Sequence, residues 1–267
     1  MDYHVKFGME ENPFVKNSKE YIYEGSEYNE IQTRLNYLLT TRGFGLLTGE
    51  AGSGKTTAVR NWCKKLNPSL YNVVYSCLST ITVLEFYRNL AAGLGLLPAF
   101  RKSDNFKLIH DEIDRLSLEK RIVPVIIIDE ANHISNAILN DLKIIFNFEM
   151  DSKNKAIILL TGLPVLNSSL NLAANEPLRQ RITMNYNISP LSKNEAKNYI
   201  LKKLDSVRCS KPVFNDSALE ALVNASSGIP RLIDKYANTS IIFASSKNLD
   251  FIDSDIVMEA VNDCQLG

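Results

Sequence analysis

The stretch "GFGLLTGEAGSGKTTAVR", residues Gly43 to Arg60, decides how the rest of the sequence is interpreted. Its centre fits the spacing G-x-x-x-x-G-K-S/T, with three glycines crowded ahead of one lysine. Glycine lets main-chain amides approach a densely charged anion, because no side chain intrudes and positive φ angles are accessible. We therefore expect a phosphate-binding loop, a P-loop, formed by Gly49, Glu50, Ala51, Gly52, Ser53, Gly54, Lys55, Thr56 and Thr57.

The residues around this loop indicate a triphosphate with a metal ion. We expect Lys55 to reach the β- and γ-phosphates of ATP and the Thr56 hydroxyl to hold Mg²⁺. The segment "GFGLLTG" is typical of a short buried strand, and apolar residues from Ala58 to Leu66 recur at helical spacing until Pro68. Strand, loop and helix follow in the order that the motif requires, which argues against the alternative of a chance match.

Length and composition are those of a soluble globular chain. The 267 residues allow one large domain, or a large domain with a smaller partner, and 45% of them are hydrophobic. No apolar run reaches the roughly 18 residues of a membrane span, and the first residues lack the pattern of a signal peptide, so we expect a cytoplasmic protein. The 30 basic and 30 acidic residues balance, which excludes a uniformly basic coat but not a local basic patch. The cysteines are scattered and are expected to be free thiols: Cys63, Cys77, Cys209 and Cys264.

A second pattern supplies two acidic side chains. The stretch "VPVIIIDEANHI", residues Val123 to Ile134, has an unbroken apolar run, typical of a central parallel strand, that ends at Asp129 and Glu130. In open α/β sheets, ligands bind at the carboxyl ends of the strands. We expect Asp129 to support Mg²⁺ through water and Glu130 to polarise the water that attacks the γ-phosphate. The alternative is a pair of helix N-cap residues that happens to follow a strand.

Four further polar residues are candidates for the same site. Thr161 ends the apolar run "AIILLTGLP", residues 156–164, and we expect it to hydrogen-bond the attacking water or the γ-phosphate. Arg179 and Arg181 precede another strand, and either can reach a neighbouring subunit's γ-phosphate. Arg231 follows Pro230 at a predicted helix start, where a cation opposes the helix dipole, so we expect it to contact nucleotide phosphates. The alternative for each arginine is an ordinary solvated or ion-paired side chain.

The alternation of patterns predicts the fold class. Strands are expected at 44–48, 73–78, 123–128, 157–161 and 182–188, with helices near 56–66, 82–93, 104–118, 136–148 and 164–172. This order predicts an α/β fold with a doubly wound parallel sheet. Helices alone follow, near 193–205, 216–226, 229–245 and 253–263, and Ser192 with Glu195 forms a plausible capping box. We expect an α/β nucleotide-binding core with an N-terminal lead-in at 1–188 and a small all-helical lid at 189–267.

With these pieces assembled, the chain resembles the AAA+ ATPases over nearly all its length. "GEAGSGKT" is similar to their Walker A motif, "VIIIDE" to Walker B, Thr161 to sensor 1 and Arg231 in "GIPR" to sensor 2. Arg179 or Arg181 is similar to their arginine finger. The opening "FGMEENPF" resembles one subgroup, the ExeA-type secretion ATPases and the TniB, TnsC and MuB-type transposition helpers. The resemblance to that subgroup implies an adenine pocket lined by Asn12, Pro13 and Phe14, with Tyr23 as a further candidate.

The resemblance implies two possible functions, and one difference from the secretion proteins favours one of them. Those proteins usually carry a membrane segment and a peptidoglycan-binding domain after the ATPase, and this sequence has neither. We therefore expect an ATP-dependent regulator of DNA transposition that oligomerises as a ring or filament on duplex DNA and recruits or activates a transposase. The alternative is an ExeA-like switch in secretion or envelope assembly that binds protein partners. A metabolic P-loop kinase is disfavoured by the adjacent acidic pair and the helical lid.

The transposition hypothesis requires cations that contact DNA phosphates without reading bases. Repetition of one modest basic patch in an oligomer would supply enough charge despite a net charge of zero. Each candidate is otherwise an ordinary solvated charge. The candidate contacts are Arg101, Lys102, Lys120, Arg121, Lys153 and Lys155.

Overall fold

The computed structural model describes residues 3–16, 18, 21–77, 81–209 and 211–265, which divide into two compact units. One unit, here called the sheet unit, comprises Asn29–Ala51 and Lys55–Ile188. The other, here called the helical unit, comprises Met1–Tyr28, Gly52–Gly54 and Ser189–Gly267. Each unit has its own hydrophobic core.

A parallel sheet forms the centre of the sheet unit. Among the described residues it has five strands in the order β2-β3-β4-β1-β5, and each neighbouring pair is parallel. The two strands between β2 and β1 are buried at every position, as their continuous apolar sequences predict. The strands are β1 (Gly43–Gly49), β2 (Tyr71–Ser76), β3 (Val123–Ile128), β4 (Ile157–Gly162) and β5 (Ile182–Ile188).

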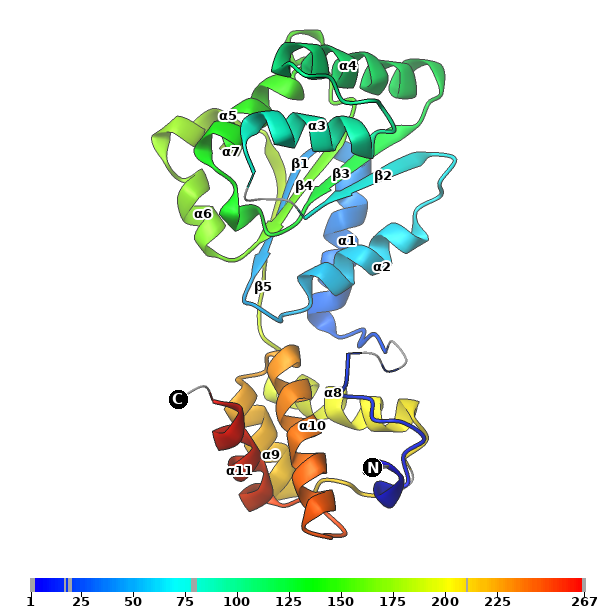
Figure 1. Cartoon of the computed structure of the whole chain (residues 1–267), viewed down its shortest axis with the longest axis vertical. Helices are drawn as coiled ribbons and strands as arrows, with labels where there is room; N and C mark the ends of the chain where they lie inside the picture. The colour runs from blue at the N-terminus through cyan, green and yellow to red at the C-terminus, as the bar shows by residue number, and fades with distance from the viewer. Residues whose placement is uncertain (1–2, 17, 19–20, 78–80, 210, 266–267) are drawn as a thin grey trace. The chain divides into compact units, whose positions relative to one another are not determined.

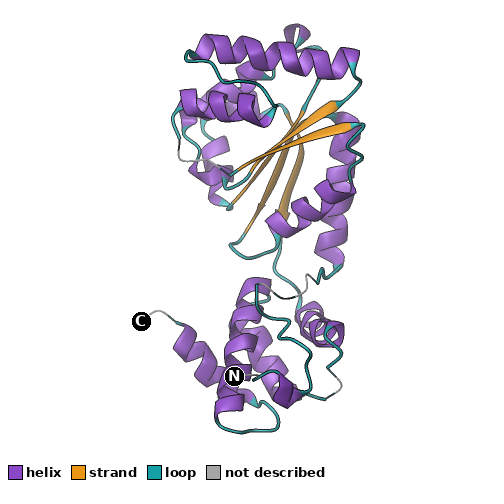
Figure 2. Ribbon diagram, turned by 45° about the vertical axis from the view of Figure 1, so that its right-hand side comes forward, coloured by secondary structure: helices purple, strands orange, loops and turns teal. Residues whose placement is uncertain are grey.

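Helices cover both faces of this sheet (Figures 1 and 2), which confirms the predicted doubly wound α/β fold. One face carries α1 (Ser26–Thr41) and α2 (Lys55–Lys65). The opposite face carries α3 (Val83–Gly93), α4 (Lys102–Asp114), α5 (Asn136–Ile145), α6 (Val165–Leu170) and α7 (Glu176–Arg179). Parallel strands need such crossover helices, because consecutive strands must start from the same edge of the sheet.

The predicted elements differ from the observed ones mainly at their ends. The strand predicted at 73–78 forms β2 two residues earlier, and position 78 lies outside the described residues. The helix predicted at 104–118 is α4 followed by a π-helical turn, Arg115–Glu119. Short 3₁₀ turns that the sequence analysis did not predict lie at Val5–Phe7, Ala131–His133, Glu149–Asp151 and Ala173–Asn175.

The helical unit contains α8 (Lys193–Ser206), α9 (Asp216–Ser226), α10 (Pro230–Ser246) and α11 (Ser254–Cys264). The predicted capping box is present, because Ser192 accepts from the Glu195 amide and the Glu195 carboxylate accepts from the Ser192 amide. The lead-in segment, which we expected to belong with the sheet, groups with the helical unit instead. The reason is burial, since Phe7, Met9 and Phe14 are part of the helical unit's core.

Within the described residues, we examined membrane-spanning helices and disulfide bonds. No helix there combines the length and the apolar character needed to cross a bilayer. The cysteines at positions 63, 77, 209 and 264 form no disulfide, as their scattered positions predict.

Candidate active site

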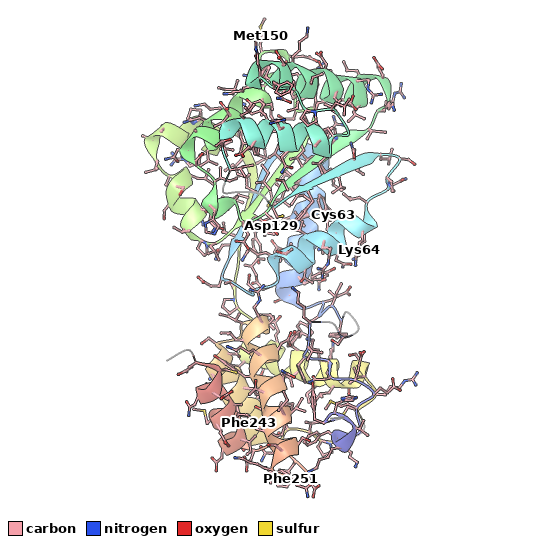
Figure 3. All side chains as sticks on the ribbon, viewed as in Figure 1. Cys63, Lys64, Asp129, Met150, Phe243 and Phe251 are labelled. Carbon is pink, nitrogen blue, oxygen red and sulfur yellow. The ribbon has the colours of Figure 1, made fainter. Side chains whose placement is uncertain are left out.

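The order of the strands brings the predicted site residues to one edge of the sheet. β4 lies between β1, which leads into the glycine-rich loop, and β3, which leads into Asp129. In the registers, Leu47 pairs with Thr161, and Ile128 pairs with Leu160. The carboxyl ends of the three strands therefore meet, and Asp129 lies at the end of β3 in Figure 3.

Lys55 is held at the first turn of α2 by the loop that precedes it. Its ammonium donates to the carbonyl of Gly49 at 2.7 Å and to that of Glu50 at 2.9 Å, and the residue is only 6% exposed. Gly52 and Gly54 have φ angles of +84° and +99°, which strongly favour glycine. The loop therefore has the backbone that the glycine spacing predicts, with a buried cation at its end.

Two other residues of the loop bear on ligand binding. The Ser53 hydroxyl is buried and has no hydrogen-bond partner within the described part of the chain. A buried polar group without a partner is costly, and a bound phosphate oxygen would supply one. Thr56 and Thr57 continue the first turn of α2, and Ala51 and Glu50 are exposed.

Asp129 is the centre of the site. Among the described residues, two hydroxyls donate to Oδ2, that of Thr56 at 3.0 Å and that of Tyr75 at 2.9 Å. Oδ1 accepts from the Thr161 hydroxyl and, at 3.0 Å, from the Glu130 amide. Asp129 is 5% exposed and Thr161 is 1% exposed, so these hydrogen bonds fix the carboxylate in a largely dry position.

Glu130 is exposed beside this buried carboxylate. Its φ of +53° lies in the left-handed region, which is uncommon for a residue with a side chain and costs roughly 1 kcal/mol or more. It occupies the N-cap position of the turn Ala131–His133, but its side chain makes no capping hydrogen bond. The alternative interpretation of the acidic pair as helix caps therefore has no support at Glu130.

Sequence reasoning missed Tyr75. Burial raises the pKa of Tyr75 well above its usual range, and its hydrogen bond to Asp129 adds to the rise, so the phenol remains a donor. The signal that was available is its position, one residue before the end of the strand that pairs with β3. The Asp129 amide donates to the Ser76 carbonyl at 2.8 Å, which ties that end of β2 to the site.

Asparagines that the sequence analysis did not single out join the neighbouring strand ends. The Asn132 carboxamide accepts from the Leu163 amide at 2.9 Å, just beyond β4. Asn167 donates to the Thr48 hydroxyl at 3.3 Å, and that hydroxyl donates to Asn187 at 3.0 Å. Amide side chains are frequent in loops of every kind, so their sequence positions carry little signal.

Arg179 and Arg181 are held differently. The Arg179 guanidinium lies 3.3 Å from Asn171 Oδ1 and 4.0 Å from a Glu176 oxygen, and its side chain is 44% exposed. It lines a hollow of about 540 Å³ beside β5. Arg181 donates to the Lys143 carbonyl, lies 2.7 Å from Asp151 Oδ1, and is 21% exposed. Arg179 therefore presents the more accessible guanidinium of the two.

Other predicted site residues lie in the helical unit. Arg231 is exposed in the first turn of α10. The Asn12 carboxamide donates to Asn238 at 2.7 Å, and the rings of Phe14 and Phe214 pack edge to face. Pro13 is buried beside them, and Tyr23 packs against Tyr199. The side chains of Asn12 and Phe14 thus take part in the packing of the helical unit, and their contact with adenine stays a prediction.

The candidate DNA contacts are unequal in accessibility. Lys155 has a side chain only 6% exposed, with Asp114 at 2.8 Å and Glu149 at 3.0 Å. Lys102 pairs with Asp141 at 2.6 Å, and Lys153 pairs with Glu149 at 2.9 Å but is 64% exposed. The other three candidates are also exposed and lie on loops or at helix ends, namely Arg101, Lys120 and Arg121.

With the geometry in place, comparisons with known proteins identify the family. Residues 38–170 match the family described as AAA domain. The fold is similar to that of Cdc6p from Pyrobaculum aerophilum, with a TM-score of 0.72 at 13% identity over 96% of this chain and 71% of that one. The chain carries an AAA domain and has the fold of the AAA+ ATPases.

Two further proteins are similar to this chain. It is 32% identical to General secretion pathway protein A of Aeromonas hydrophila over 248 residues, which are 90% of this chain. The chain spans 44% of the length of that protein. Its fold is also similar to the ORC1 protein of Aeropyrum pernix in complex with DNA, with a TM-score of 0.67 at 14% identity over 94% of this chain and 68% of that one.

AAA+ ATPases bind nucleotide, usually together with Mg²⁺, and the residues at the end of β3 fit that ion. Among the described residues, no group of three or more His, Cys, Asp or Glu side chains is placed to hold a metal. Mg²⁺ differs from other metals in this respect, because it commonly takes one or two protein oxygens and completes its shell with phosphates and water. The Thr56 hydroxyl and the Asp129 carboxylate, 3.0 Å apart, supply such a pair.

Proposed function

We propose that this AAA+ ATPase is an assembly switch controlled by ATP. The nucleotide binds at the glycine-rich loop of one subunit, and an arginine of the next subunit completes the binding site. The observation that carries the proposal is the joint placement of three elements. Lys55 ends the loop, Thr56 and Thr161 both donate to Asp129, and the exposed Glu130 follows directly. This set matches the parts needed to bind a triphosphate and to activate water beside it.

Each residue of the sheet unit would have a distinct role in hydrolysis. Lys55 neutralises the β- and γ-phosphates, and Thr56 with Asp129 holds Mg²⁺, which adds positive charge where the phosphates carry negative charge. Glu130 accepts a proton from the attacking water, and its exposed position leaves it room to do so. Thr161 keeps Asp129 in place and is positioned on the strand between the loop and Glu130.

Arg179, rather than Arg181, is our candidate for the arginine that acts on a neighbouring subunit. An arginine that acts in trans needs an accessible guanidinium that is not firmly held within its own chain. Arg179 is 44% exposed and is held loosely, by a 3.3 Å hydrogen bond to Asn171 and a Glu176 oxygen at 4.0 Å. Arg181 is held by a carbonyl and by Asp151 at 2.7 Å.

Two variants with one control test the ATPase site. Lys55→Ala should abolish or severely weaken nucleotide binding, because the buried ammonium is its main counter-charge. Glu130→Gln should keep binding but lose hydrolysis by about 10²-fold or more, as expected when a general base is removed. Glu119→Gln, which removes an exposed carboxylate from the π-helical turn, serves as the control and should hydrolyse at the parent rate. If Glu130→Gln matches that control, the role of Glu130 is refuted.

The partner we favour is a protein, as in secretion or envelope assembly. The support is the 32% identity to a secretion protein over 90% of this chain. Among the basic candidates, Lys155 is buried and Lys102 pairs with Asp141 at 2.6 Å, so these two contribute little to a DNA-binding surface. The sequence analysis placed the transposition regulator ahead of the secretion switch, and its reason concerned segments outside the ATPase domain.

A DNA-bound regulator of transposition remains the second candidate. It is supported by the likeness of the fold to ORC1 in complex with DNA and by the exposed cations Arg101, Lys120 and Arg121. The test is co-sedimentation with duplex DNA at about 50 mM salt, where phosphate contacts are strong. ATP-dependent sedimentation with DNA, lost on substituting the three cations by alanine, would favour this candidate. Assembly that ignores DNA would favour the protein-partner switch.

A further inference from the structure

Asp129 has no spare hydrogen-bonding capacity in this structure. A carboxylate offers about four lone-pair positions and donates nothing. Within the described residues four donors reach it: the hydroxyls of Thr56 and Tyr75 at Oδ2, and the Thr161 hydroxyl with the Glu130 amide at Oδ1. A hydrated Mg²⁺ must take one of these positions, either directly or through a bound water.

The four donors differ in how readily they can leave. The Glu130 amide belongs to the main chain next to Asp129, and Thr161 is 1% exposed on β4. Thr56 stays beside the metal, because it is itself the predicted ligand. Tyr75 is 53% exposed at the sheet's edge strand, and its long side chain can swing into solvent without disturbing the core.

We infer that Tyr75 is a removable lock on the magnesium site: its hydroxyl occupies the Asp129 Oδ2 position that the hydrated metal needs, and it must leave when Mg²⁺ binds. Tyr75 thus acts through Asp129 and is a positioning residue. The inference rests on the proposed function and adds that metal entry competes with a hydrogen bond inside the chain. The direction is distinctive, since a residue that merely orders Asp129 would help the metal rather than hinder it.

The structure supports this competition in one further way. Tyr75 and Thr56 share one oxygen, so the tyrosine competes at the atom that already faces the predicted metal ligand.

The test compares Tyr75→Phe with the parent protein and with Tyr71→Phe as a matched control. Tyr71 begins the same strand, is half-buried, and lines a different hollow beside Cys63 and Leu66. A fluorescent ADP analogue is titrated into each protein in EDTA and at a series of free Mg²⁺ concentrations. Mg²⁺ binding to the nucleotide in solution is the same for all proteins, so it cancels in the comparison.

We expect Tyr75→Phe to lower the half-saturating Mg²⁺ concentration roughly tenfold, which corresponds to about 1.4 kcal/mol. That is within the range for a hydrogen bond to a charged group. Affinity in EDTA should not change, and Tyr71→Phe should match the parent. Tyr75→Leu should give the same shift, because it also lacks the hydroxyl.

An unchanged or raised Mg²⁺ requirement in Tyr75→Phe would overturn the inference and leave the proposed function intact. Failure of the parent protein to bind the nucleotide with or without Mg²⁺ would overturn both. A drop in Mg²⁺ requirement of equal size in Tyr71→Phe would also overturn it, because the effect would then belong to the strand rather than to the bond with Asp129.

Discussion

Lys155 is a basic residue whose burial indicates a role in stability rather than in DNA binding, and the variant Lys155→Met tests that role. Its ammonium makes contacts of 2.8 Å with Asp114 and 3.0 Å with Glu149, and lies 5.4 Å from the centre of the Phe148 ring. Each charge-assisted hydrogen bond contributes about 1.5–3 kcal/mol when its geometry is good. The two carboxylates are 41% and 37% exposed, so water can replace the lysine at both and reduce the loss. Methionine keeps the unbranched apolar stem in the site.

We therefore expect Lys155→Met to reduce the free energy of unfolding by about 1.5–3 kcal/mol, measured by urea unfolding. Lys153→Met is the matched control: that side chain is 64% exposed in a single ion pair with Glu149, so the loss should be below about 0.5 kcal/mol. If Lys155 were instead a DNA contact, its loss would lower the slope of log affinity against log salt by roughly 0.9. A variant as stable as the parent, or one that changes this slope by that amount, would refute the structural role.

Three other predictions follow from particular contacts. Arg179→Ala should reduce ATP hydrolysis without a matching loss of nucleotide binding, and hydrolysis should return when this variant is mixed with a Lys55→Ala variant. Arg181→Ala should mainly lower the melting temperature. Equal losses of hydrolysis in the two arginine variants would contradict the different roles given to Arg179 and Arg181. Hydrogen bonds from Ser26 and Ser192 lower the pKa of Glu195 from 4.5 to about 2, so its stabilising contribution is complete above pH 4.5 and is lost as the pH falls toward 2. Glu195→Gln should remove that part of the acid-induced drop in melting temperature, and parallel acid profiles would argue against it. Gly45→Ala should destabilise the fold by about 1–3 kcal/mol in urea unfolding, because the new methyl would lie 2.5 Å from a Leu38 carbon; an unchanged midpoint would show that α1 can shift away at no cost.

The elements that the sequence predicted well are those whose signal is local. The continuous apolar runs of β3 and β4 are buried at every position, and the glycine spacing gave the loop without any knowledge of its neighbours. Asp129 and Thr161 could be placed at strand ends for the same reason. That the two side chains touch depends on β4 lying between β1 and β3, which no local pattern shows.

Other features depend on partners far along the chain. Phe7 and Phe14 look like parts of an irregular opening, yet they are buried with helices almost 200 residues later. In the sequence, Tyr75 looks like an ordinary residue of a strand with mixed burial. Alternation along a strand predicts which face of the sheet a side chain occupies, but not which carboxylate it contacts. Only the pairing of β2 with β3 brings it to Asp129.

The two arginines show most clearly what sequence cannot separate. They stand two residues apart, with the same chemistry, before the same strand. What distinguishes them is the loop at Glu149–Asp151, where three successive residues have positive φ angles and Asp151 is thereby brought to Arg181. None of the three residues is glycine, so the sequence does not predict that turn. A guanidinium that fixes such a loop already has a structural role, which is why we propose Arg179 as the side chain that acts on a neighbouring subunit.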